Sequence, residues 1–170
     1  MLSRKDLTLN ILMMLAMLSW GLSWTNAKLV GQYADAPLIM VWRFLIAAIS
    51  IAPILLITKI SFFIKKKDLL LIFSNSLFMI SYNYFYFRGT QVGLAGTGGV
   101  LVTTLNPVLT LLVSSIIYHT KISKKDIFGL TYGIIGGGLI IRIWQQDMSS
   151  LFQSGNLFFV LASISWVCVT

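Results

Sequence analysis

The segment LAGTGGVLVTTLNPVLTLLVSSIIY, residues Leu94–Tyr118, carries no charge and is long enough to cross a lipid bilayer as a helix. It nevertheless contains three glycines near its start and the pair Asn106–Pro107 in its middle. A proline inside a helix leaves the carbonyl four residues earlier, that of Thr103, without its usual donor and favours a kink. At membrane depth such freed backbone is tolerated only beside protein or a watered cavity. The segment therefore predicts a spanning helix that has protein or a water-filled cavity beside its proline.

The rest of the chain has the composition of a membrane protein. Of its 170 residues, 57% are hydrophobic and 11% are charged, whereas about a quarter are charged in soluble domains. The sequence predicts an all-α integral membrane protein, a multi-spanning helix bundle. The expected spans are residues 7–27, 38–58, 69–87, 94–118 and 127–143, with a sixth starting near Asn156.

The basic residues indicate the orientation of the spans. Nine of the thirteen Lys and Arg residues fall before the first span or in the second and fourth connections. Three fall on the other side, and Arg43 lies inside the second span. By the positive-inside rule the N-terminus is cytoplasmic, and we expect a multi-pass protein of the inner (plasma) membrane. Because the net charge of +8 is explained by topology, no nucleic-acid partner is expected.

Other charged and aromatic residues fit this arrangement. Asp6, Asp68 and Asp126 each stand just before a span that begins on the cytoplasmic side, where they can cap helix N-termini. Trp24, Trp42 and Trp144 fall near the opposite interface, where indoles are favoured, so we interpret them as anchors.

The chain contains an internal repeat. NILMMLAMLSW (residues 10–20) aligns without a gap with NLFFVLASISW (residues 156–166), and Asn, Leu, Ala, Ser and Trp coincide. Five spans separate the copies, so the second enters the membrane from the opposite face, as in transporters with inverted repeats. We therefore expect residues 1–143 to form a first repeat, residues 144–155 an outer loop, and residues 156–170 the start of a second repeat. On this interpretation the chain is the first half of a longer protein.

Two spans carry polar stripes. Helical spacing places Gly99, Thr103, Asn106, Thr110 and Ser114 along one face of the fourth span. Asn75, Met79, Tyr82, Asn83 and Tyr86 group on one face of the third. Either these faces line an aqueous cavity, or they form hydrogen bonds between helices, and the sequence leaves both open.

Arg43 is costly in the second span, and no acidic residue within the five spans can pair with it. Backbone carbonyls, a lipid phosphate, a missing half of the protein or an anionic substrate group could satisfy it. In the fifth span, the spacing of Gly129, Gly133 and Gly137 predicts close helix packing. No carboxylate pair, His cluster or Cys pair suggests an enzyme, and we expect no cofactor or metal.

These features resemble the EamA branch of the drug/metabolite transporter superfamily. The resemblance covers nearly the whole chain and rests on the order of four motifs: WGLSWTNAKLV (20–30), APLIMVWRFLIAA (36–48), LAGTGGVLVTTLNPVLTLL (94–112) and KISKKDIFGLTYGIIGGGLII (121–141). Thr120 stands where the family often has an acidic residue. The resemblance implies ten helices in two inverted halves around a central cavity, with alternating access.

The sequence thus predicts a secondary carrier or exporter of a small organic metabolite, such as an amino acid, completed by a missing second repeat or a second copy. The alternative is a non-transporting membrane interaction protein, or a half-transporter that needs a partner chain. The predicted substrate path comprises Trp20, Trp24, Arg43, Met79, Tyr82, Asn83, Tyr86, Thr103, Asn106 and Thr110. The residues expected to bend or pack helices are Gly96, Gly99, Pro107, Gly129, Gly133 and Gly137.

Overall fold

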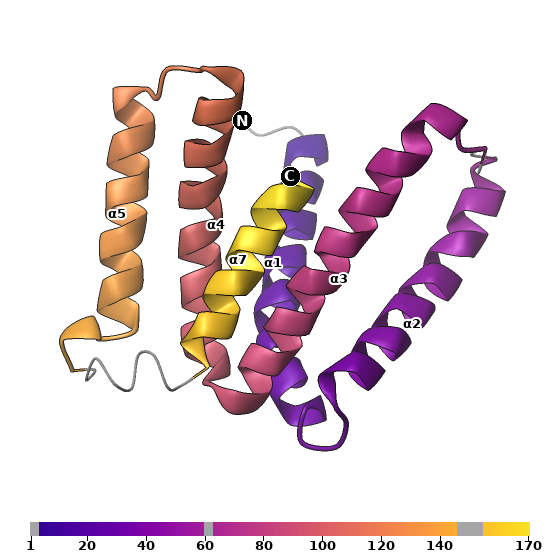
Figure 1. The fold of residues 1–170 in the computed structure, drawn as a ribbon, viewed down its shortest axis with the longest axis horizontal. Helices are drawn as coiled ribbons and strands as arrows, with labels where there is room; N and C mark the ends of the chain where they lie inside the picture. The colour runs from indigo at the N-terminus through magenta and orange to yellow at the C-terminus, as the bar shows by residue number, and fades with distance from the viewer. Residues whose placement is uncertain (1–3, 60–62, 146–154) are drawn as a thin grey trace.

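The computed structural model describes residues 4–59, 63–145 and 155–170, and these residues form a helical bundle (Figure 1). The helices are α1 (Arg4–Val30), α2 (Ala36–Ile57), α3 (Leu69–Val92), α4 (Ala95–Tyr118), α5 (Lys124–Ile140) and α7 (Asn156–Val169). Two 3-10 turns, Lys66–Asp68 and Ile143–Gln145, precede α3 and follow α5. The described residues contain no strand, which confirms the all-α prediction.

Three helices, α1, α2 and α4, are long and apolar enough to cross a membrane by themselves. At 17 residues, α5 is shorter, while α3 is long but rich in Asn, Ser and Tyr. The predicted third span ended at Phe87, before Arg88, but α3 continues to Val92. The fifth helix ends at Ile140, three residues before the predicted end. Part of the expected outer loop, residues 146–154, lies outside the described residues.

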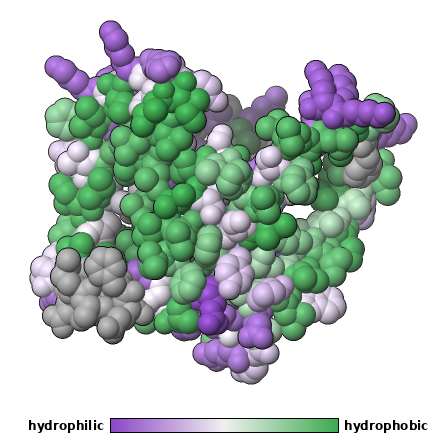
Figure 2. Space-filling model, viewed as in Figure 1, coloured by the Kyte–Doolittle hydropathy of each residue, from purple (hydrophilic) through white to green (hydrophobic). Residues whose placement is uncertain are grey.

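The helices run up and down, so their connections alternate between two ends of the bundle. The α2–α3 and α4–α5 connections, which hold most of the lysines, share one end, whereas the α1–α2 and α3–α4 turns lie at the other (Figure 1). On the face drawn in Figure 2, hydrophilic residues gather at these ends and hydrophobic residues cover the helices between them. This distribution matches a bundle that crosses a bilayer.

The packing centre of the bundle is α7, which contacts both α3 and α4. Phe159 of α7 is fully buried because its ring fills a slot between Gly89 of α3 and Gly98 of α4. A Cβ atom placed at Gly89 would lie 2.6 Å from the ring, and one at Gly98 would overlap it. Small residues at helix contacts allow this close approach, which provides most of the attraction between helices in lipid.

The start of α5 is held by a capping box. The backbone N–H of Asp126 donates to Ser123 Oγ (3.2 Å), and the backbone N–H of Ser123 donates to Asp126 Oδ2 (3.0 Å). The predicted capping role of Asp126 is therefore confirmed. Asp68 occupies the N-cap position of α3, but its side chain makes no capping hydrogen bond.

Substitution of Gly98 by Ala is expected to lower the stability of the bundle by about 1–3 kcal/mol, because the new methyl group overpacks the Phe159 slot. The measurement is the temperature at which the detergent-solubilised protein aggregates. Gly129→Ala is the matched control, since no atom lies within 4 Å of a Cβ at that position. Replacing Phe159 by Leu in the Gly98→Ala background should restore part of the loss. Equal behaviour of the two alanine variants would contradict the slot.

A second prediction concerns acid pH. The side-chain and backbone hydrogen bonds of Ser123 lower the pKa of Asp126 from its ordinary value of 3.8. The capping contribution is therefore complete above that value and is lost as the pH falls through the lowered pKa of the folded state. Hydrogen exchange should show protection of the first turn of α5 decreasing only in this acid range. Asp126→Asn should abolish that pH dependence, whereas Asp68→Asn should leave it intact.

Candidate functional site

A cavity of about 690 Å³ lies between α1, α2, α3, α4 and α7. This volume falls in the range of sites that bind small organic molecules. Eight residues of the predicted substrate path line it: Trp20, Arg43, Met79, Tyr82, Asn83, Thr103, Asn106 and Thr110. Pro107 also lines it, together with three residues that the sequence did not single out: Phe44, Trp166 and Thr170.

Phe44 comes from α2, Trp166 comes from α7, and Thr170 directly follows α7. The signal for Trp166 was present in the internal repeat, in which it aligns with Trp20. Nothing in the local sequence marks Phe44 or Thr170, because their positions depend on how α2 and α7 pack against α3.

Arg43 reaches the cavity from the second turn of α2. Its guanidinium carbon lies 5.8 Å from the ring centre of Tyr86 and 5.6 Å from that of Phe87. These distances allow cation–π attraction, which holds the flat guanidinium against α3. Among the described residues no carboxylate pairs with Arg43, so its charge is available at the cavity.

Two amide oxygens beside the cavity lack a hydrogen-bond donor. Asn83 donates its amide N–H to the carbonyl of Met79 (2.8 Å), but its Oδ1 is buried without a partner. Asn106 Oδ1 is in the same state. A buried acceptor without a partner costs about 1–3 kcal/mol, so a hydrogen-bond donor supplied to either oxygen stabilises the site.

Two hydroxyl groups of the polar stripe on α4 form hydrogen bonds within their own helix. Thr103 Oγ1 donates to the carbonyls of Gly99 (2.7 Å) and Val100 (3.1 Å), and Ser114 Oγ donates to that of Leu111 (3.1 Å). These bonds stay within α4 and join no other helix. The helix itself continues through Pro107, whose ring faces the cavity.

Two residues of the predicted path lie outside the cavity. Trp24 is only 5% exposed and packs against Tyr86, with the ring centres 4.6 Å apart. The interpretation of Trp24 as an interface anchor is therefore wrong, because the bundle encloses its indole. Tyr86 is also buried, and its hydroxyl donates to the carbonyl of Ser23 (3.1 Å). It supports Arg43 from behind instead of lining the cavity.

The glycines predicted to pack against other helices differ in whether a neighbouring side chain lies close to them. Gly99 is in ordinary contact with Trp24, and a Cβ at Gly137 would lie 2.7 Å from Thr104 Oγ1, so both allow close approach. Gly96, Gly129 and Gly133 have no atom within 4 Å of a Cβ among the described residues. Close packing at these three positions stays a prediction.

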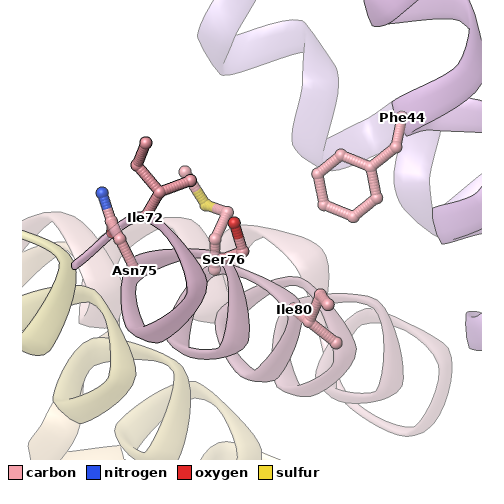
Figure 3. Close-up of a pocket in the computed structure, with 6 residues that line it drawn as sticks. Phe44, Ile72, Asn75, Ser76 and Ile80 are labelled. Carbon is pink, nitrogen blue, oxygen red and sulfur yellow. The ribbon is translucent and has the colours of Figure 1, made fainter. Parts of the chain in front are cut away.

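A second, smaller groove of about 400 Å³ lies between α2 and α3 (Figure 3). Phe44 projects from α2 toward Ile72, Asn75, Ser76 and Ile80 of α3. Asn75 therefore lies in this groove and not in the main cavity. Phe44 and Met79 border both spaces, which makes the groove a neighbour of the cavity.

Side-chain hydrogen bonds link the C-terminal ends of α1 and α3 and the turns that follow them. Lys28 Nζ donates to the carbonyls of Gln91 (3.0 Å) and Gly93 (2.8 Å). Gln91 Nε2 donates to the carbonyls of Ala34 (2.9 Å) and Gly31 (3.3 Å). A lysine at the C-terminal end of a helix also complements the helix dipole. The network explains why α3 continues past Phe87.

The arrangement of helices and cavity agrees with comparisons to known proteins. The model of the EamA-like transporter family matches residues 7–142. The chain belongs to this family. An uncharacterized transporter of Bacillus subtilis, YyaM, is 25% identical over 171 residues, which cover 95% of this chain and 54% of that protein.

An uncharacterized transporter of Archaeoglobus fulgidus is 26% identical over 142 residues, which cover 84% of this chain and 49% of that protein. The chain thus spans about half the length of these two relatives. No solved structure matches it. Family membership and the apolar helices make this a multi-pass membrane protein.

Substitution of Lys28 by Met is expected to destabilise this EamA-like bundle by about 1.5–3 kcal/mol, because hydrogen bonds from a charged donor are lost. The measurement is again thermal aggregation in detergent. Lys121→Met, in an exposed connection, is the control. In a double-mutant cycle, Gln91→Ala should cost less in the Lys28→Met background than in the unmodified protein. Strictly additive effects would argue against a shared network.

Proposed function

We propose that this chain forms the first five-helix repeat, residues 1–143, and the first helix of the second repeat of a secondary carrier. The carrier moves a small organic metabolite, such as an amino acid, by alternating access. We place it in the plasma membrane with a cytoplasmic N-terminus, as the lysine-rich connections favour. A second repeat or a second copy of the chain completes the path.

The observation that carries this proposal is the chemistry of the 690 Å³ cavity. It combines an arginine that no carboxylate of the described residues neutralises with two buried amide oxygens, those of Asn83 and Asn106, that lack hydrogen-bond donors there. An anionic group on the solute satisfies Arg43, and N–H or O–H groups on the same solute satisfy Asn83 and Asn106. A small metabolite with both kinds of group, as in an amino acid, fits this set.

The positions of the polar groups also support transport. Asn106, Pro107 and Thr110 lie in the middle of α4, and Asn83 lies in the middle of α3. Carriers with inverted repeats bind their solutes near the bilayer midplane, where helices are interrupted or bent. Pro107 has no backbone N–H, so a bend of α4 at this residue breaks no hydrogen bond donated by it.

The test is transport by the full-length protein in proteoliposomes, with a set of radiolabelled amino acids as probes. Arg43→Gln should reduce transport of any accepted probe 10-fold or more, because a charge-assisted hydrogen bond is lost. Arg43→Lys should retain part of the activity, since it keeps the charge but not the flat group that stacks on Tyr86.

Arg142→Gln is the matched control, because this arginine lies outside the cavity. The amount of each variant in the membrane is measured in parallel. Unchanged transport by Arg43→Gln at an unchanged amount would remove the proposed role of Arg43. Failure of every amino acid as a probe would remove this substrate class.

A further inference from the structure

The two copies of the internal repeat both reach the cavity. Residues 10–20 belong to α1 and residues 156–166 belong to α7, and these helices run in opposite directions (Figure 1). The last residue of each copy is a tryptophan, Trp20 or Trp166. Both tryptophans line the cavity, although they are far apart in the sequence.

The two tryptophans also lie at the same depth. The end of α1 and the start of α7 meet at Gly93, whose carbonyl accepts from Lys28 and whose N–H nitrogen lies 2.9 Å from a Cβ placed at Gly155. Trp20 is ten residues before the end of α1 at Val30, and Trp166 is ten residues after the start of α7 at Asn156. Each is therefore ~15 Å from this end, half of a hydrocarbon core of ~30 Å.

Equal depth has a geometric consequence for an inverted repeat. The two-fold axis that relates such repeats lies in the membrane plane and exchanges the two halves of the bilayer. Equivalent residues can share one depth only if both lie at the level of the axis. The axis therefore passes through the level of Trp20 and Trp166, and thus through the cavity that they line.

Neither indole is an interface anchor at this depth. Trp20 is 45% exposed and Trp166 is partly exposed, and both residues line the cavity. Trp166 is braced by Tyr82, with the ring centres 5.0 Å apart. Flat aromatic faces at a cavity wall favour a ligand with a flat, unsaturated face of its own.

We propose that Trp20 and Trp166 are a symmetry-related pair of solute-contacting residues, which select an organic anion with a flat face. This inference rests on the proposed function, because Arg43 holds the anionic group of the same solute. Because the axis places the two positions at one level of the cavity, both indoles contact the same solute.

The test uses the full-length protein and two probes, radiolabelled benzoate and cyclohexanecarboxylate, in equilibrium binding. The two acids share a carboxylate and a six-membered ring, but only benzoate is flat. Benzoate should bind more tightly. Trp20→Ala and Trp166→Ala should each weaken benzoate binding by roughly 3- to 10-fold and by similar factors, with little effect on cyclohexanecarboxylate. Phe at either position should restore most of the affinity.

Trp42→Ala is the matched control, because Trp42 is exposed on α2 and does not line the cavity. Equal binding of the two acids, or a loss at only one of the two tryptophans, would overturn the pair. If both acids bind in an Arg43-dependent manner but the tryptophan variants behave like Trp42→Ala, only this inference falls. If neither acid binds, the inference of a flat-anion site falls. If Arg43→Gln leaves binding unchanged, the anion site of the proposed function falls with it.

Discussion

The contact on which the bundle depends is the ring of Phe159 between Gly89 and Gly98. In lipid there is little hydrophobic gain from bringing two helices together, so attraction comes from close packing of many atoms. The two glycines let a large ring enter where side chains would keep the backbones apart. This contact ties α7 to α3 and α4 at once, and the other helices pack around these three.

The position of α7 also creates the cavity. Its buried face, which includes Phe159 and Ala162, meets α3 and α4 near the end where the Lys28 network lies, and Trp166 follows where the helices leave space. The polar side of α3 and the polar side of α4 are thereby turned toward one volume. Because lipid offers no hydrogen-bond donors, Asn83 and Asn106 are better tolerated beside this cavity than on the lipid-facing surface.

The two ends of the bundle differ in how firmly they are held. At the Lys28 end, side chains of α1 and α3 bind backbone carbonyls, and the buried residues of α2 lie in its first turns. Toward the other end, the rest of α2 and the first half of α3 are largely exposed, and a groove lies between them (Figure 3). Packing and hydrogen bonds therefore concentrate at one end, the cavity occupies the middle, and the groove lies toward the other end.

The sequence by itself determined the helices and which residues share a helix face, because charge, length and the period of 3.6 residues are local properties. That is why Thr103, Asn106 and Thr110 could be grouped on α4, and Met79, Tyr82 and Asn83 on α3. Only the tertiary structure decided what covers each face. It enclosed Trp24 and Tyr86, put Asn75 in a separate groove and brought Trp166 to the cavity, because these outcomes depend on contacts between helices far apart in the chain.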